Sequence, residues 1–347
     1  MGVVTRWCHS GWYSEVELSE IGPLPRFVAW VAPDPARPSV LAWGGFTKTL
    51  VEPLSMDETH PETLAPPVAA PPGVLWTKLH IPQAPAALVE RERLLARLDA
   101  APRGGLTLVC APAGFGKSAV LAEACRRWSN ATWLSLDQAD NDTVRFWRHV
   151  AATLDRALGD QSRLTELLEQ AIRRGDEPLG AALATSILNG LPPEREPVVL
   201  VLDDYHLIET EDVHQSVRLL LDHAPTALRV AMATRADPPL PLAKWRAAGT
   251  LTELRAAELR FTAAEAASLL GNVAGSAISE RTAQTLAERT EGWAAGLQLA
   301  GLSLASRDNA DAFAESFSGS HRFVLDYLTE EVLDQQPPSL GDFLLQT

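Results

Sequence analysis

Short apolar runs alternate with amphipathic segments through the middle of this 347-residue chain. Continuous apolar runs of about four to eight residues are typical of parallel strands that are covered on both faces. Four such runs and a weaker fifth predict strands at Leu106–Cys110, Ala131–Leu136, Val198–Leu202, Leu228–Thr234 and Leu251–Leu254. Helical spacing appears at Leu88–Leu98, Thr143–Leu158, Leu164–Arg173 and Leu179–Leu188. This alternation predicts an α/β fold, a parallel sheet flanked by helices, over residues 77–261.

The strand pattern stops at Phe261, and only helical patterns follow. Thr262 and Glu265 have the spacing of a capping box, which predicts that a helix begins there. Further helices are predicted at Ala263–Leu270, Ser279–Thr290, Trp293–Ala305 and Arg322–Leu333. We therefore expect an all-helical subdomain over residues 262–317. Residues 318–347 are expected to begin a further, truncated domain, with a new element from Leu340.

The first part of the chain has no clear periodic pattern. Aromatic residues are scattered through it, and a cluster of Pro and Ala then predicts a semi-extended linker. The prolines of this cluster are Pro61, Pro66, Pro67, Pro71 and Pro72. We expect residues 1–76 to form a poorly ordered, disordered leader that ends in this Pro-rich linker.

Charge and cysteine content narrow the function classes. Lys and Arg number 30 against 44 Asp and Glu, a net charge of −14. Such a surface repels nucleic acid and anionic membranes, so this chain is not expected to bind DNA directly. The three cysteines form no CxxC pair, which favours a reducing, cytoplasmic setting. No apolar run reaches the ~18 residues of a membrane span.

The stretch APAGFGKS follows the first predicted strand and precedes a helical pattern. It consists of Ala111, Pro112, Ala113, Gly114, Phe115, Gly116, Lys117 and Ser118. A strand, a glycine-rich turn, Lys-Ser and a helix are typical of a loop that binds nucleoside triphosphates. Gly114 and Gly116 allow backbone N–H groups to face the phosphates. Lys117 can reach the β- and γ-phosphates and Ser118 can ligate Mg²⁺, so ATP or ADP with Mg²⁺ is the expected cofactor.

A second motif, VVLVLDDYH, ends the third predicted strand in two carboxylates. Ligands of open α/β sheets bind at the carboxyl ends of the strands. We expect Asp203 to complete the Mg²⁺ site with Ser118, and Asp204 to orient or polarise the attacking water. The position of this motif, downstream of the phosphate loop with another strand between, makes the two motifs together a specific signal.

A third motif, RVAMATRAD, ends the next predicted strand in Thr234-Arg235. An arginine near a transferring phosphoryl group stabilises its charge, and the order of strands should bring Arg235 beside Lys117. Asp204, Lys117 and Arg235 are thus the candidate catalytic residues. The alternative for Arg235 is an ordinary solvated arginine at a strand end.

Other polar residues favour structural roles. His149, His206, His214 and His223 lack a metal-ligand spacing such as HExxH. Asp137 and Asp140 follow the second predicted strand, and we expect them to cap the loop there. No G-x-S-x-G nucleophile motif occurs.

Several stretches together resemble one family. They are TKLHIP (Thr77–Pro82), LVERERLLARLD (Leu88–Asp99), APAGFGKS, ATWLSLDQADND (Ala131–Asp142), LVLDDYHLI (Leu200–Ile208), ATRADPPLPLAKWRAAGTLTELRAAELRFTAAEA (Ala233–Ala266), RTEGWAAGLQLAGLSL (Arg289–Leu304) and SGSHRFVLDYLTEEVLDQQP (Ser318–Pro337). In this order they resemble the N-terminal ATPase part of the large ATP-binding LuxR-type, or MalT-like, transcriptional regulators. The resemblance covers roughly residues 77–347.

The resemblance implies a P-loop ATPase of the STAND class that switches conformation with its nucleotide. Members rest as closed monomers with ADP, and inducer with ATP opens them for self-association. A winged-helix module, a sensor and a DNA-binding helix-turn-helix follow the ATPase, so residues 318–347 would begin the winged helix. The resemblance gives Lys117, Ser118, Asp203, Asp204 and Arg235 the roles above, and it places Glu90-Arg91 near the adenine. Many relatives carry Pro after the Gly292-Trp293 pair as part of a nucleotide-sensing contact, whereas this chain has Ala294 there.

Three functions are compatible with these features. The first is a regulatory switch with weak ATPase activity, ATP and water giving ADP and phosphate. The second is a truncated nucleotide-binding fragment without independent activity. The third is a P-loop phosphotransferase, which would need an acceptor pocket and a lid with arginines; the all-helical extension favours the switch.

Overall fold

The computed structural model describes residues 2–8, 11–17, 28–31, 40–44, 47–48, 73–83, 87–159, 162–191, 197–305, 307, 309–318, 322–329 and 331. The chain divides into two units, Met1–Val68 and Ala69–Thr347. The second unit holds every motif singled out above, and it begins earlier than the predicted domain start at residue 77. The Pro-rich stretch 61–72 and the predicted element from Leu340 lie outside the described residues.

The first unit contains strands where the sequence pattern indicates no regular elements. Five antiparallel strands pair in chain order: β1 (Gly2–Cys8), β2 (Gly11–Glu17), β3 (Val28–Val31), β4 (Val40–Gly44) and β5 (Thr47–Lys48). Valine, tryptophan, tyrosine and threonine favour strands without any helical spacing. The scattered aromatic residues of the leader therefore have a physical explanation that a search for periodicity misses.

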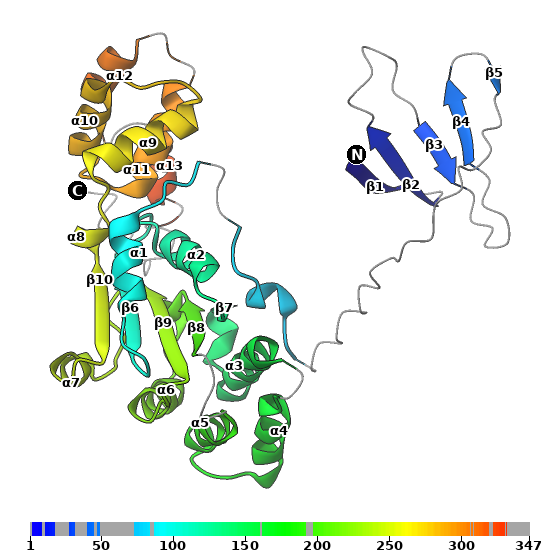
Figure 1. Cartoon of the computed structure of the whole chain (residues 1–347), viewed down its shortest axis with the longest axis vertical. Helices are drawn as coiled ribbons and strands as arrows, with labels where there is room; N and C mark the ends of the chain where they lie inside the picture. Colours follow the sequence, from blue (N-terminus) through cyan, green and yellow to red (C-terminus); the bar gives the residue numbers. More distant parts are fainter. Residues whose placement is uncertain are drawn as a thin grey trace. The chain divides into compact units, whose positions relative to one another are not determined.

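The second unit is built on a five-stranded parallel sheet, as the sequence predicts (Figure 1). Its strands are β6 (Leu106–Cys110), β7 (Ala131–Ser135), β8 (Val198–Asp203), β9 (Leu228–Thr234) and β10 (Leu251–Arg255). Their order across the sheet is β10-β6-β9-β8-β7. The strand before the phosphate loop thus lies between β10 and β9, and β9 separates it from the strand that carries the two aspartates.

Side chains of β6 alternate between two hydrophobic cores. Leu106 and Leu108 pack into one core with Phe146 and Trp147, while Val109 packs into the other. The first core is covered by α3 (Thr143–Leu158), α4 (Leu164–Arg174), α5 (Leu179–Gly190) and α6 (Glu211–Asp222), and the second by α1 (Glu92–Asp99) and α2 (Lys117–Arg127). The short α7 (Leu242–Ala247) precedes β10. Burial on both faces explains the continuous apolar runs.

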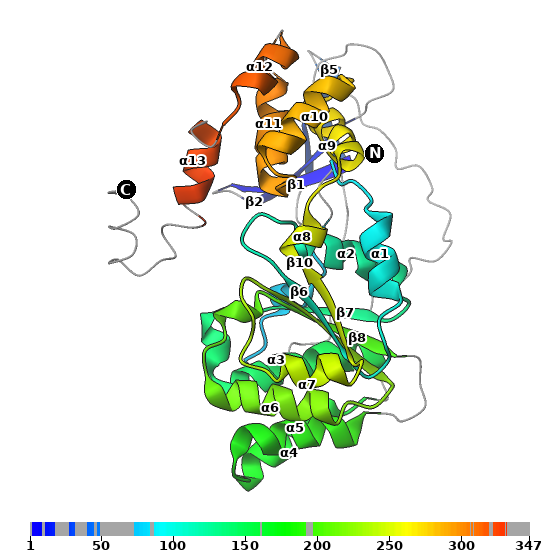
Figure 2. The same cartoon turned by 90° about the vertical axis from the view of Figure 1, so that its left-hand side faces the viewer.

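A helical subdomain follows the sheet and has its own core (Figure 2). It contains α9 (Ala263–Ala274), α10 (Glu280–Arg289), α11 (Ala294–Leu304), α12 (Ala310–Ser316) and α13 (Arg322–Leu328). The short α8 (Ala256–Leu259) precedes it and packs through Leu259 into the second core of the sheet. The predicted capping box forms, because Thr262 Oγ1 accepts from the Glu265 amide at 3.2 Å and Glu265 accepts from the Thr262 amide at 2.9 Å. Glu265 also binds Arg93 of α1, which ties the subdomain to the sheet.

The segment before α1 docks on the sheet through a buried charge cluster. Lys78 Nζ pairs with the fully buried Asp140 and lies 3.1 Å from Asp137. His149 Nδ1 lies 2.9 Å from Asp140, and Asp140 accepts from the Asp137 amide at 2.9 Å. Burial raises the pKa of Asp140, but the hydrogen bonds from His149 and Lys78 outweigh it and lower that pKa to about 2. The two aspartates cap their loop and also hold this segment.

Candidate functional site

The phosphate loop connects β6 to α2 through two glycines in the left-handed region. Gly114 has φ 76° and Gly116 has φ 77°, a conformation that L side chains rarely adopt. Lys117 is the first residue of α2 and is only 7% exposed, and its Nζ donates to the Pro112 carbonyl at 3.0 Å. Burial, and then the positive charge of Arg235, lower the pKa of Lys117. The ammonium group is therefore held against the inside of the loop.

The second predicted pair lies at the carboxyl end of β8. Ser118 Oγ donates to Asp203 Oδ1 at 2.9 Å, so the two expected Mg²⁺ ligands are in contact. Burial, and then the charge of Asp204, raise the pKa of Asp203 to about 6. A carboxylate that is desolvated in this way gains from a nearby cation.

Asp204 follows Asp203 with φ 57°, a left-handed conformation that aspartate tolerates better than most residues. This backbone turn ends β8. Oδ1 of the Asp204 carboxylate lies 3.9 Å from His206 Nδ1, and 43% of the Asp204 side chain is exposed. Burial lowers the pKa of His206, although Asp204 opposes the effect. Asp204 is thus a solvent-accessible carboxylate beside the phosphate loop.

Arg235 follows β9 directly beside the loop. The Ala111 amide donates to the Thr234 carbonyl at 3.2 Å, which joins the exit of β9 to the first residue of the loop. Arg235 acts electrostatically on Lys117, and its guanidinium binds Glu331. The strand order therefore brings Lys117, Asp203, Asp204 and Arg235 to one edge of the sheet.

Arg91 lies beneath the loop at 3% exposure. Its Nη1 donates to the Leu259 carbonyl at 2.9 Å, its Nη2 lies 3.5 Å from the Gly116 carbonyl, and its guanidinium stacks 4.6 Å from the Phe261 ring centre. Burial lowers the pKa of Arg91 to about 10. Arg91 thus joins the phosphate loop to the start of the helical subdomain.

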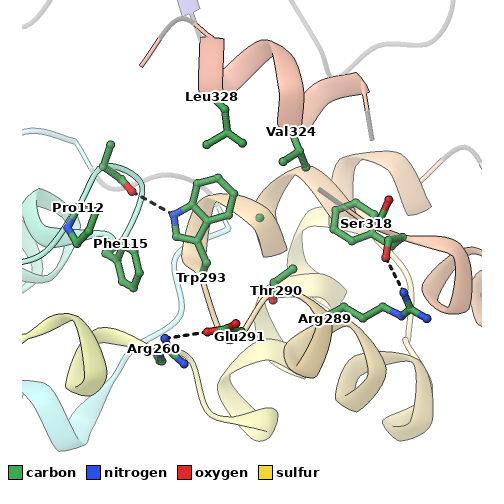
Figure 3. A pocket seen from close by; sticks show the side chains of 13 residues that line it. Pro112, Phe115, Arg260, Arg289, Thr290, Glu291, Trp293, Ser318, Val324 and Leu328 are labelled. Carbon is green, nitrogen blue, oxygen red and sulfur yellow. Dashed lines mark hydrogen bonds and ion pairs between the residues drawn. The ribbon is translucent and has the colours of Figure 1, made fainter. Parts of the chain in front are cut away.

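The start of α11 binds the phosphate loop directly, at the Gly292-Trp293 element that the resemblance links to nucleotide sensing. Trp293 Nε1 donates to the Ala113 carbonyl at 3.1 Å (Figure 3). The Ala295 amide donates to the Gly114 carbonyl at 2.9 Å. A Cβ at Gly114 would lie 2.6 Å from Trp293 Nε1, so this close approach needs glycine. Ala294, which stands where many relatives have Pro, is the first residue of α11 and leaves both hydrogen bonds in place.

A pocket of about 420 Å³ lies where the loop, the helical subdomain and α13 meet (Figure 3). Its lining consists of Pro112, Ala113, Phe115, Arg260, Arg289, Thr290, Glu291, Trp293, Gly296, Phe317, Ser318, Val324 and Leu328. Arg260 pairs with Glu291 at 2.9 Å and Arg289 donates to the Phe317 carbonyl at 3.0 Å. The charge of Arg260 is therefore balanced by a carboxylate, whereas Arg289 keeps its positive charge in the pocket wall.

The arrangement fits a nucleotide with Mg²⁺. Positive-φ glycines, a buried ammonium group and the N-terminus of α2 suit phosphate. Within the described part of the chain no group of three or more His, Cys, Asp or Glu could hold a metal ion by itself. Ser118 and Asp203 would hold Mg²⁺ together with phosphate oxygens, and Mg²⁺ would neutralise developing phosphate charge.

Comparison with known proteins agrees with this geometry. Residues 88–233 match the AAA ATPase domain family. The HTH-type transcriptional regulator MalT of Serratia proteamaculans is 35% identical over 260 residues, 74% of this chain and 28% of that protein. The serine/threonine-protein kinase PknK of Mycobacterium tuberculosis is 32% identical over 263 residues, 75% of this chain and 23% of that protein. This chain therefore spans about a quarter of the length of these relatives.

Solved structures show weaker likeness. A variant of Thermotoga maritima RuvB aligns over 74% of this chain and 80% of its own at 17% identity, with a TM-score of 0.38. The Aeropyrum pernix Orc1 protein aligns over 75% and 72% at 16% identity, with a TM-score of 0.43. The fold assignment therefore rests on the parallel strand order of the sheet and not on these alignments.

The chain thus contains a P-loop ATPase domain and resembles the ATPase part of MalT-type regulators, as its motifs predict. No helix in the described ranges has the length and apolar character needed to cross a membrane.

Proposed function

We propose that this chain is a nucleotide-dependent conformational switch with weak ATPase activity, in which ATP and ADP favour different positions of the helical subdomain. The two hydrogen bonds from Trp293 and Ala295 to the phosphate loop carry the proposal. A nucleotide bound in the loop would lie against the same peptide units, Ala113 and Gly114, to which the helical subdomain is hydrogen-bonded. A ligand shifts a conformational equilibrium only by its difference in affinity for the two states, and this contact supplies a route to such a difference.

Lys117, Asp204 and Arg235 supply the chemistry of the proposed slow hydrolysis. Lys117 would bind the phosphates, Arg235 would stabilise charge on the γ-phosphate, and Asp204 would orient the attacking water. Arg91 would support the loop at the base of the nucleotide site. Mg²⁺ would bind at Ser118 and Asp203. Each of these groups lies on an element of the sheet or beside it.

The relatives support a switch over a metabolic enzyme. One is named a transcriptional regulator and the other a protein kinase, yet both share the segment that this chain contains. A segment found both in a transcriptional regulator and in a protein kinase is better suited to regulating the attached domains than to catalysing one metabolic reaction. We propose that self-association and any DNA-linked output depend on parts of the relatives beyond this segment, and that the chain acts in the cytoplasm.

The first experiment is a titration of the full chain with fluorescent ADP and ATP, with and without Mg²⁺, beside Lys117→Ala. We expect the parent to bind both nucleotides with little turnover and Lys117→Ala to lose ATP binding, because the variant lacks the buried ammonium group of the loop. Arg126→Ala is the control: it removes a cation from the last turn of the same helix, away from the loop.

Different outcomes separate the alternatives. Rapid turnover that needs a phosphate acceptor would favour a phosphotransferase. Unchanged ATP affinity in Lys117→Ala would disprove the assignment of the loop, and a parent chain that binds neither nucleotide would favour the inactive fragment.

A further inference from the structure

The segment that follows α13 reaches Arg235, the residue proposed above to bind the γ-phosphate. Arg235 Nη1 donates to the Glu331 carbonyl at 2.9 Å, and Arg235 Nη2 lies 3.0 Å from Glu331 Oε2. Both terminal nitrogens of the guanidinium are thus engaged by one residue. Carboxylate and phosphate compete for the same end of an arginine, because both accept parallel N–H donors from it.

The same segment also packs on the residue that binds the phosphate loop. Tyr327 of α13 meets Trp293 edge to face, with ring centres 5.5 Å apart. Val324 and Leu328 of α13 line the pocket beside Trp293 (Figure 3). α13 and Glu331 therefore contact the site at two residues, Trp293 beside the loop and Arg235 at the end of β9.

We propose that Glu331 is an internal competitor for the γ-phosphate of ATP, which holds Arg235 in an autoinhibitory contact. The inference rests on the proposed nucleotide switch and adds the residue that opposes ATP. ADP lacks the γ-phosphate and leaves the Arg235–Glu331 pair intact. ATP can engage Arg235 only after the carboxylate has moved away, so the pair lowers the affinity for ATP relative to ADP.

Displacement of Glu331 would also be transmitted along the chain. Glu331 lies four positions beyond Tyr327, which packs on Trp293, and Val324 holds α13 in the core of the helical subdomain. ATP thereby favours movement of Glu331 away from Arg235, whereas ADP favours the intact pair.

The test compares ATP and ADP affinities of the full chain with those of Glu331→Gln. The side chain of Glu331 is 43% exposed, so the isosteric change leaves folding intact. We expect the ATP affinity to rise about three- to fivefold, the range for a partly exposed ion pair, with the ADP affinity unchanged. In an Arg235→Gln background Glu331→Gln should have no further effect.

Asp326→Asn is the matched control. Asp326 belongs to α13, pairs with Arg322 at 3.7 Å and is 58% exposed, so this variant removes one negative charge from the same segment without touching Arg235. An equal shift in Asp326→Asn, or an unchanged ratio of ATP to ADP affinity in Glu331→Gln, would overturn the inference while leaving Lys117-dependent binding and the proposed function standing. A parent chain without Lys117-dependent binding would overturn both.

Discussion

Asp204 combines an unusual backbone conformation with an accessible carboxylate beside the phosphate loop. Its φ of 57° restricts the residues that can stand there, and asparagine is one of the few that tolerate it. Asp204→Asn therefore changes the charge without straining the turn. This makes the position suitable for testing whether the carboxylate acts in hydrolysis.

We predict that Asp204→Asn binds ATP as the parent does but hydrolyses it about a hundredfold more slowly, the usual contribution of a positioned base. Phosphate release under single-turnover conditions measures the rate, and the nucleotide titration shows that the site is intact. A variant that hydrolyses ATP at the parental rate would show that Asp204 does not orient the water.

Residues whose chemistry is local in the chain could be placed from the sequence. The phosphate loop and the two strand ends carry their signal within a few positions, and the structure brings Lys117, Asp203, Asp204 and Arg235 together. The Gly292-Trp293 element is indicated by the resemblance alone, and Glu331 by no pattern. Their contacts join positions 180 and 96 residues apart, and only tertiary structure supplies the partners.

At the scale of elements, the predicted strands and helices agree closely with those observed because burial on both faces gives a strong pattern. The predicted strands Leu106–Cys110 and Leu228–Thr234 have the observed bounds, as does the helix Thr143–Leu158. The strands of the first unit gave no such signal. Short antiparallel strands depend on β-favouring residues and on cross-strand side-chain pairs, and they need no long apolar run in the sequence.

The 3₁₀ turn Trp76–Leu79 shows how one charge can hold an element in place, because its Lys78 pairs with the buried Asp140. We predict that Asp140→Asn lowers the free energy of unfolding by about 3 kcal/mol at pH 7, since it removes the buried carboxylate that pairs with the buried Lys78 and leaves that cation only the half-exposed Asp137 as an acidic partner among the described residues. Denaturant unfolding of the two proteins measures the difference. Asp137→Asn, which alters the exposed partner 3.1 Å from the same lysine, should cost less than about 1 kcal/mol.

The same charge cluster predicts that the free energy of unfolding depends on pH. The pKa of Asp140 is lowered to about 2 in the folded chain, below the ~3.9 of an unfolded aspartate. Its stabilisation is therefore complete above about pH 4 and is lost as the pH falls towards 2. The difference in the free energy of unfolding between the parent and Asp140→Asn should shrink over that interval. A difference that stays constant from pH 7 to pH 3 would contradict an ionised Lys78–Asp140 pair.

In the second unit the phosphate loop lies between the parallel sheet and the helical subdomain. The sheet supplies β6, β8 and β9 on one side, and the helical subdomain supplies Trp293 and Ala295 on the other. Arg91 and the Arg93–Glu265 pair join the same two bodies near the loop. Nucleotide binding and the position of the subdomain are thus linked through a small set of contacts, and the linkage must be reciprocal.

Hydrogen exchange tests this linkage across the molecule. We predict that ADP with Mg²⁺ slows amide exchange both in the phosphate loop and at the start of α11, where the Ala295 amide binds the Gly114 carbonyl. Trp293→Phe removes the indole donor to Ala113 but keeps a ring against Tyr327, so it should weaken the protection of α11 by about 1 kcal/mol, the net value of one hydrogen bond. Trp245→Phe, which removes an indole donor to Asp222 instead, should leave that protection unchanged. If ADP protected the loop while α11 exchanged at its free rate, the subdomain would not sense the nucleotide, and the contact would be static packing.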